Sequence, residues 1–132
     1  MIDDTDTSNV VEHRIAGPRF KTLVIDDEPE LANIAGELLT YYDIEVLVVY
    51  SAREALVLLE AHGDIDAIFS DVMMPCMTGL ELAETVANAY PSIRIVLTSG
   101  FTARALWERH TRRFPFIGKP YSIEAVIQLL KS

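Results

Sequence analysis

Short apolar runs alternate with segments of helical periodicity along most of this chain. The runs have the length and composition of buried strands, and they lie at residues 20–25, 44–49, 67–70, 93–97 and 114–118. Each run is followed by a segment with an apolar stripe, at about 29–42, 51–62, 79–90, 102–111 and 122–131. Strands and helices that alternate with short connections predict an α/β fold, a doubly wound five-stranded parallel sheet with helices on both faces.

The first of these helical segments has the clearest start. Pro29 suits the first turn of a helix, where its missing N–H costs no hydrogen bond. From the apolar spacing we expect the following residues to face the sheet: Leu31, Ile34, Ala35, Leu38 and Leu39. Ser51 and Ser122 are the expected N-caps of the second and last helices.

The first nineteen residues differ from the rest of the chain. They hold Asp3, Asp4 and Asp6 among small polar residues, followed by Gly17-Pro18, with no sustained apolar period. We therefore expect residues 1–19 to be a flexible leader, or the end of a linker from another domain. Residues 20–132 are expected to form one domain, and an apolar content of 50% can supply its core.

Charge and cysteine content narrow the function classes. A formal net charge of -9 argues against direct binding to nucleic acid or to an anionic membrane surface. The single cysteine, Cys76, excludes an internal disulfide and a cysteine-based zinc site, and it fits a reducing compartment. The sequence has neither a basic start followed by an apolar run nor a stretch of membrane-spanning length, so we expect a cytoplasmic protein.

Polar side chains follow the expected strands at their carboxyl ends. Asp26 and Asp27 follow the first strand, Asp71 the third, Thr98 the fourth and Lys119 the fifth. Open parallel sheets bind their ligands at this edge. Three neighbouring carboxylates repel one another unless cations are present, so Lys119 and a hard divalent ion are the expected counter-charges.

These residues also admit simpler readings. Asp26 and Asp27 could act as helix N-terminal carboxylates, although two in a row directly after a buried strand favour a metal site. A nucleotide-binding loop would need glycines after the first strand, where this chain has acidic residues that repel phosphate. Met73, Met74 and Met77 are interpreted as apolar filling.

Together, four segments resemble the receiver domain of two-component response regulators, a flavodoxin-like fold. They are Ile25-Asp26-Asp27-Glu28, Asp71 with Met74-Pro75 and Gly79 behind it, Thr98-Ser99-Gly100, and Lys119-Pro120. The resemblance covers roughly residues 20 to 132 and is of the chemotaxis-regulator type. The local sequences around Thr98 and Lys119 resemble those of receivers attached to hybrid histidine kinases.

The resemblance implies a phospho-accepting signalling role rather than an enzyme. Asp71 would take a phosphoryl group from a phosphohistidine on a histidine kinase or a histidine phosphotransfer protein. Mg²⁺, with Mn²⁺ as an alternative, would be held by Asp26, Asp27, Asp71 and the backbone carbonyl of Met73. Lys119 would neutralise a phosphoryl oxygen.

The resemblance also implies a conformational switch. Thr98 would donate a hydrogen bond to the phosphoryl group, Phe116 would be the switching aromatic, and Pro120 would form the family's cis peptide after Lys119. The signal would be passed on through the surface of the fourth helix, the fifth strand and the last helix. The protein would be a monomer, or a weak dimer through that surface. In this chain that surface would also hold Arg104, Trp107 and Arg112.

Two alternative functions stay open at this point. The domain could dock partners without being phosphorylated, although its complete set of acceptor residues argues against that. A Mg²⁺-dependent aspartyl phosphatase would need a second acid two residues after the nucleophile, and this chain has Met73 there. The chain could be a stand-alone regulator, the terminal receiver of a hybrid kinase or a fragment of a longer regulator.

Overall fold

The computed structural model describes residues 19–100 and 114–132. Five strands form one sheet in the order β2-β1-β3-β4-β5, and every neighbouring pair is parallel. The strands are β1 (Lys21–Ile25), β2 (Glu45–Val49), β3 (Ala67–Asp71), β4 (Arg94–Ser99) and β5 (Phe116–Gly118). This confirms the expected doubly wound parallel sheet.

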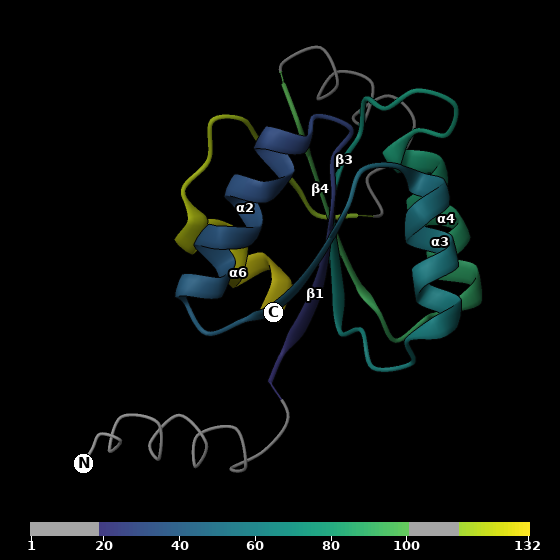
Figure 1. The fold of residues 1–132 in the computed structure, drawn as a ribbon, viewed down its shortest axis with the longest axis horizontal. Helices are drawn as coiled ribbons and strands as arrows, with labels where there is room; N and C mark the ends of the chain where they lie inside the picture. The colour runs from purple at the N-terminus through teal and green to yellow at the C-terminus, as the bar shows by residue number, and fades with distance from the viewer. Residues whose placement is uncertain (1–18, 101–113) are drawn as a thin grey trace.

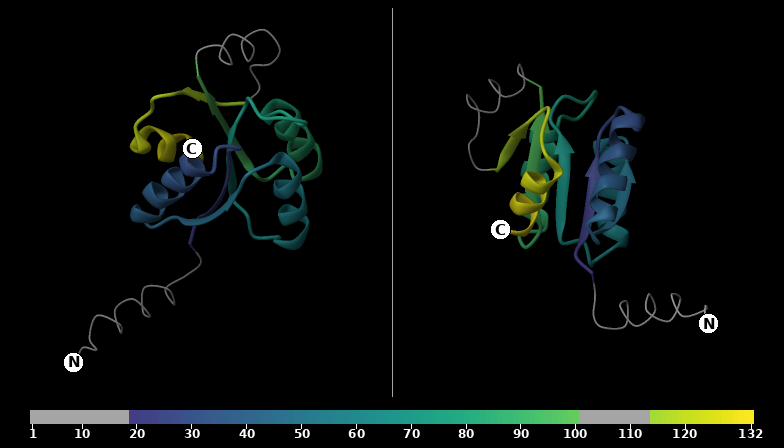
Figure 2. Two further views of the ribbon diagram at one scale, coloured as in Figure 1. Left: turned by 45° about the horizontal axis from the view of Figure 1, so that its top comes forward. Right: turned by 90° about the vertical axis from the view of Figure 1, so that its left-hand side faces the viewer.

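Helices cover both faces of the sheet. They are α2 (Pro29–Tyr41), α3 (Ala52–Ala61), α4 (Gly79–Ala89) and α6 (Ile123–Lys131). Figure 1 shows α2 and α6 on one face and α3 and α4 on the other, and Figure 2 shows the same layers from two further directions. The helix expected at 102–111 and residues 1–18 of the expected leader lie outside the described residues.

Each face of the sheet buries its own apolar cluster. In β1, Leu23 and Ile25 pack towards α3 and α4, whereas Val24 between them packs towards α2 and α6. In β3, Ile68 and Phe69 divide between the two clusters in the same way. Central strands that are buried on both sides read as continuous apolar runs, which is why they were recognisable in the sequence.

The described helices begin at residues suited to a helix start, and three of them have a side-chain cap. Pro29 occupies the first turn of α2. The side chains of Ser51 and Ser122 accept hydrogen bonds from backbone N–H groups in the first turns of α3 and α6. No helix in residues 19–100 or 114–132 is long and apolar enough to cross a membrane.

The orientation of α2 differs from the expected one. Its buried residues are Ala32, Ala35, Gly36 and Leu39. The side chains of Leu31, Ile34 and Leu38, which were expected to face the sheet, are 42%, 53% and 42% exposed. Small residues on the inward face explain the difference, because they let α2 approach β2 closely. A Cβ atom on Gly36 would lie only 2.9 Å from Cγ2 of Val48.

The strand register aligns the polar strand ends. Asp71 is the last residue of β3 and pairs with Thr98 of β4, while Ser99 of β4 pairs with Gly118 of β5, just before Lys119. Asp26 follows β1 directly, and its N–H donates to the carbonyl of Val49 at the end of β2 (3.3 Å). All of these residues therefore lie at the carboxyl edge of the sheet.

Candidate functional site

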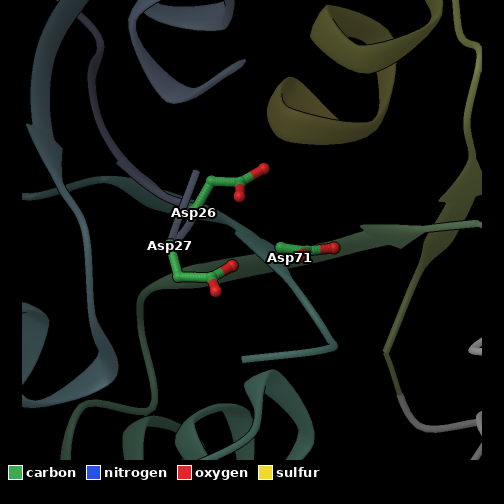
Figure 3. A group of neighbouring side chains, drawn as sticks. All are labelled: Asp26, Asp27 and Asp71. Carbon is green, nitrogen blue, oxygen red and sulfur yellow. The ribbon is translucent and has the colours of Figure 1, made fainter. Parts of the chain in front are cut away.

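Three aspartates meet at the carboxyl edge of the sheet. Figure 3 shows Asp26 and Asp27 leaving the chain just after β1 and Asp71 at the end of β3, with their carboxylates gathered together. One oxygen from each lies within 4.8 Å of the others. Asp26 and Asp71 are buried and Asp27 is half-buried, so at least two of these charges are largely withdrawn from water.

Asp26 serves the backbone as well as the site. Its Oδ1 accepts a hydrogen bond from the N–H of Glu28 at 3.0 Å, just before α2 begins. Its Oδ2 lies 3.4 Å from Nζ of Lys119. The N-cap of α2 is Glu28, which has no side-chain cap, so Asp26 is not the cap of this helix, and its second oxygen joins the charge cluster.

Lys119 is the basic side chain that joins the cluster within the described part of the chain. Its Nζ lies 3.6 Å from Oδ1 of Asp71, in addition to its contact with Asp26. Its backbone N–H donates to the carbonyl of Ser99 (2.9 Å), and the peptide bond to Pro120 is cis. Burial opposes the charge of Lys119, but the carboxylates of Asp71 and Asp26 outweigh burial and leave its pKa raised.

The environment of Asp71 is unfavourable for a negatively charged carboxylate. Its pKa is raised to about 6, and burial is the largest cause of this increase. The charge of Lys119 and a hydrogen bond with the Ser99 side chain lower the pKa, whereas the charges of Asp26 and Asp27 raise it. Its Oδ1 is buried and accepts no hydrogen bond from any residue that the structure describes. A buried carboxylate oxygen without a donor needs a positive charge nearby.

A hard divalent cation fits these donors. Mg²⁺ prefers oxygen ligands from one or two carboxylates and keeps several waters, and the cluster offers carboxylate oxygens within a short span. Met73 follows Asp71 by two residues, and its side chain is 51% exposed, so its expected role as apolar filling is wrong. Met74 is buried and Met77 packs against the α3/α4 cluster, as expected of filling.

Thr98 and Phe116 lie on neighbouring strands beside this cluster. The hydroxyl of Thr98 donates a short hydrogen bond to the backbone carbonyl of Ile117 in β5 (2.6 Å). Phe116 is half-buried at the start of β5 and packs against the α3/α4 cluster. Arg104, Trp107 and Arg112, expected on the output surface, lie outside the described residues.

An apolar cavity that the sequence did not reveal opens beside the carboxylates. Its volume is about 300 Å³, and it lies between α2 and the chain that follows Lys119. Its walls include the exposed residues Leu31, Ile34 and Leu38 of α2, together with Pro120 and Tyr121. The sequence contained a signal for this cavity, namely more large apolar residues on α2 than one inward stripe can hold.

The sequence profile of the response regulator receiver domain matches residues 22–131. The chain belongs to this family. Transcriptional regulatory protein TrcR of Mycobacterium tuberculosis is 26% identical over 121 residues, 90% of this chain and 47% of TrcR. Sensor kinase CckA of Brucella abortus is 28% identical over 112 residues, 83% of this chain and 12% of CckA. This receiver chain thus spans about half or less of the length of these relatives.

Solved structures of receivers are similar as well. Chemotaxis protein CheY4 of Vibrio cholerae superposes with a TM-score of 0.74 at 25% identity, covering 86% of this chain and 98% of CheY4. The receiver domain of hybrid histidine kinase CckA gives a TM-score of 0.68 at 27% identity, covering 84% of this chain and 95% of that domain. The chain is therefore a receiver domain of two-component signalling, and none of these similarities favours an aspartyl phosphatase.

Proposed function

We propose that Asp71 is the residue that accepts the phosphoryl group. The observation that carries the proposal is its Oδ1, which is buried, accepts no hydrogen bond from the described residues and faces Nζ of Lys119 at 3.6 Å. In the reaction, a carboxylate oxygen of Asp71 forms a bond to phosphorus while the bond from phosphorus to the donor imidazole nitrogen breaks. The imidazole leaves with that electron pair, and Asp71 becomes an acyl phosphate.

The same proposal assigns the cation site. Asp26, Asp27, Asp71 and the backbone carbonyl of Met73 would hold Mg²⁺, or Mn²⁺ with the same oxygen ligands. The bound ion would offset the negative charge on the phosphoryl oxygens. Among the described residues, Lys119 is the basic side chain that faces Asp26 and Asp71, so without such a cation a further anionic group would be repelled.

Lys119 and Thr98 would then respond to the new group. Lys119 would exchange its contact with Asp71 for a phosphoryl oxygen, a charge-assisted hydrogen bond. Thr98 would give up the carbonyl of Ile117, with which it now forms a bond of 2.6 Å, and donate to the phosphoryl group instead. Phe116 directly precedes Ile117 in β5, so this exchange would reach the proposed switching aromatic.

The apolar cavity beside the site supports a helical protein as phosphodonor. Any donor must approach Asp71 from the carboxyl edge of the sheet, where Leu31, Ile34 and Leu38 of α2 are exposed next to Asp26 and Lys119. Exposed apolar side chains that border a reactive group suit the apolar face of a partner helix. We assign that partner as a histidine kinase or a histidine phosphotransfer protein in the cytoplasm.

Phosphorylation by a small donor tests the proposal without the natural partner. The full chain is incubated with acetyl phosphate and Mg²⁺ and followed by intact-mass spectrometry, with a matched sample in EDTA. We expect one phosphoryl mass per chain in Mg²⁺, none in EDTA, and a much slower gain for Asp27→Ala, which loses a direct ligand. Equal labelling in EDTA would contradict the cation assignment, and no labelling at all would favour a receiver that only docks partners.

A further inference from the structure

The segment between the proposed acceptor and α4 is closed at both ends. The N–H of Gly79, the first residue of α4, donates to the carbonyl of Val72 at 2.8 Å. The N–H of Val72 donates to the carbonyl of Thr98 in β4 at 2.9 Å. The residues from 72 to 79 therefore form a loop whose two ends are held together and fixed to the sheet, and Met73 lies inside it.

Gly79 is in contact with the backbone of Asp71. A Cβ atom at residue 79 would lie 2.2 Å from the carbonyl oxygen of Asp71 and 2.9 Å from Cα of Val72. Real Cβ atoms do not approach other atoms so closely, and these neighbours are backbone atoms at the carboxyl end of the central strand β3. The Asp71 carbonyl also accepts a hydrogen bond from the Ser70 hydroxyl at 2.9 Å, which fixes it further.

The start of α4 is held in this position by its own cap. The Thr78 hydroxyl accepts from the N–H of Glu81 (3.2 Å), and the Glu81 carboxylate accepts from the N–H of Thr78 (2.9 Å). This reciprocal pair sets the direction in which the chain enters the helix. A side chain at position 79 would therefore have to move the start of α4 and the loop joined to it, since the β3 side is fixed.

We infer that Gly79 is a positioning residue for the cation site. By letting α4 rest on the Asp71 peptide, it would keep the loop 72–79 closed and so hold the Met73 carbonyl, the proposed ligand in that loop, in one position. Residues that orient metal ligands commonly change affinity by ten- to a hundredfold when they are altered. This inference rests on the proposed assignment of the Met73 carbonyl as a ligand.

The test compares Gly79→Ala with Gly63→Ala. Gly63, after α3, is the matched control because a Cβ atom there would meet nothing within 4 Å. Mg²⁺ affinity is measured by isothermal titration calorimetry on the 132-residue chain, at a temperature where circular dichroism shows every variant folded. A loss of stability alone would not change the affinity of protein that is already folded.

We expect Gly79→Ala to bind Mg²⁺ at least about tenfold more weakly than wild type, and Gly63→Ala to stay within twofold. Binding by Gly79→Ala within twofold of wild type would overturn the inference and leave the proposed function standing. A wild-type chain that does not bind Mg²⁺ would overturn both, so the two failures are distinguishable.

Hydrogen exchange of the wild-type chain serves if Gly79→Ala does not fold. If Mg²⁺ binds only while the loop is closed, an ion concentration ten times Kd should slow exchange of the Gly79 N–H about tenfold. The N–H of Gly63 should exchange at an unchanged rate. Exchange of Gly79 that does not respond to Mg²⁺ would overturn the inference.

Discussion

At the scale of single residues, Asp71 combines burial with an unsatisfied charge. The residue is only 6% exposed, and one of its carboxylate oxygens has no hydrogen-bond donor among the described residues. Burial is the main reason that its pKa rises from the usual 3.8 to about 6. Burial and the oxygen without a donor suit Asp71 to bind a cation and a phosphoryl group. Without a metal, the same two features make the ionised side chain destabilising for the folded protein.

This cost predicts how stability depends on pH in EDTA. Because the pKa of Asp71 is higher in the folded protein than in the unfolded chain, its contribution is fully present below pH 3.8 and is lost as pH rises through about 6. The loss amounts to about 3 kcal/mol at most. Asp71→Asn cannot ionise, so at pH 7.5 we expect it to be about 1–3 kcal/mol more stable than wild type.

Urea unfolding at pH 4 and pH 7.5 in EDTA measures this difference. The advantage of Asp71→Asn should be small at pH 4 and large at pH 7.5. Glu60→Gln on the exposed face of α3 is the control and should show no such change. An advantage that is the same at both pH values would contradict the assigned pKa of Asp71.

At the scale of elements, strand ends could be predicted from the sequence and the orientation of α2 could not. Continuous apolar runs marked the strands, and the polar residues after them marked the site, because parallel strands share one edge. The apolar residues of α2 exceeded what one face could bury. Which of them faced the sheet depended on the close approach at Gly36, a tertiary contact without a signal in the helix period.

A pair of adjacent leucines tests the orientation of α2. Leu39 is fully buried, whereas Leu38 is 42% exposed. Leu39→Ala should lower the free energy of unfolding by about 2–5 kcal/mol, because it leaves a cavity. Leu38→Ala should cost less than about 1 kcal/mol, a typical value for a surface site. Equal losses of unfolding free energy in the two variants would support the orientation of α2 that was expected from the sequence.

We expect the loops that follow β3 and β4 to determine how long a phosphoryl group survives on the acceptor. Asp71 and Thr98 pair in register, and from the receiver family we expect Met73 and Gly100, each two residues further on, to flank the approach of water to the acceptor. Neither side chain can orient a water molecule. We therefore expect slow self-dephosphorylation, with Met73→Asn combined with Gly100→Glu decaying at least about tenfold faster.

Loss of phosphoryl mass with time in Mg²⁺ measures both rates. The control is an exposed change away from the site, Glu60→Gln, which should decay as wild type does. Wild-type decay as fast as that of the double variant would show that these two positions do not control the approach of water.

At the scale of the whole molecule, a side-chain hydrogen bond links the site to the edge strand β5, in addition to the backbone pairing of β4 with β5. Thr98 connects the strand beside Asp71 to the carbonyl of Ile117 in β5. The sequence predicted Thr98 and Phe116 through family resemblance. It could not predict that the Thr98 hydroxyl is already occupied by Ile117, because that bond depends on the distance between β4 and β5.

This connection predicts how far phosphorylation is felt. In wild type, the amide NMR signals of Ile117 and Gly118 should shift when the protein is phosphorylated, because Thr98 leaves the Ile117 carbonyl. Thr98→Val keeps the shape of the side chain without the hydroxyl, so these shifts should be much smaller in the phosphorylated variant. Wild-type shifts confined to the residues around Asp71 would contradict a coupling through Thr98.

The central claim is that Asp71, and neither Asp26 nor Asp27, carries the phosphoryl group. Borohydride reduces an aspartyl phosphate to homoserine and leaves free carboxylates unchanged, so peptide mass mapping after phosphorylation in Mg²⁺ identifies the acceptor. We predict homoserine at position 71 in wild type and no homoserine in Asp71→Asn. Homoserine at position 26 or 27 in wild type, or undiminished homoserine formation in Asp71→Asn, would contradict the account.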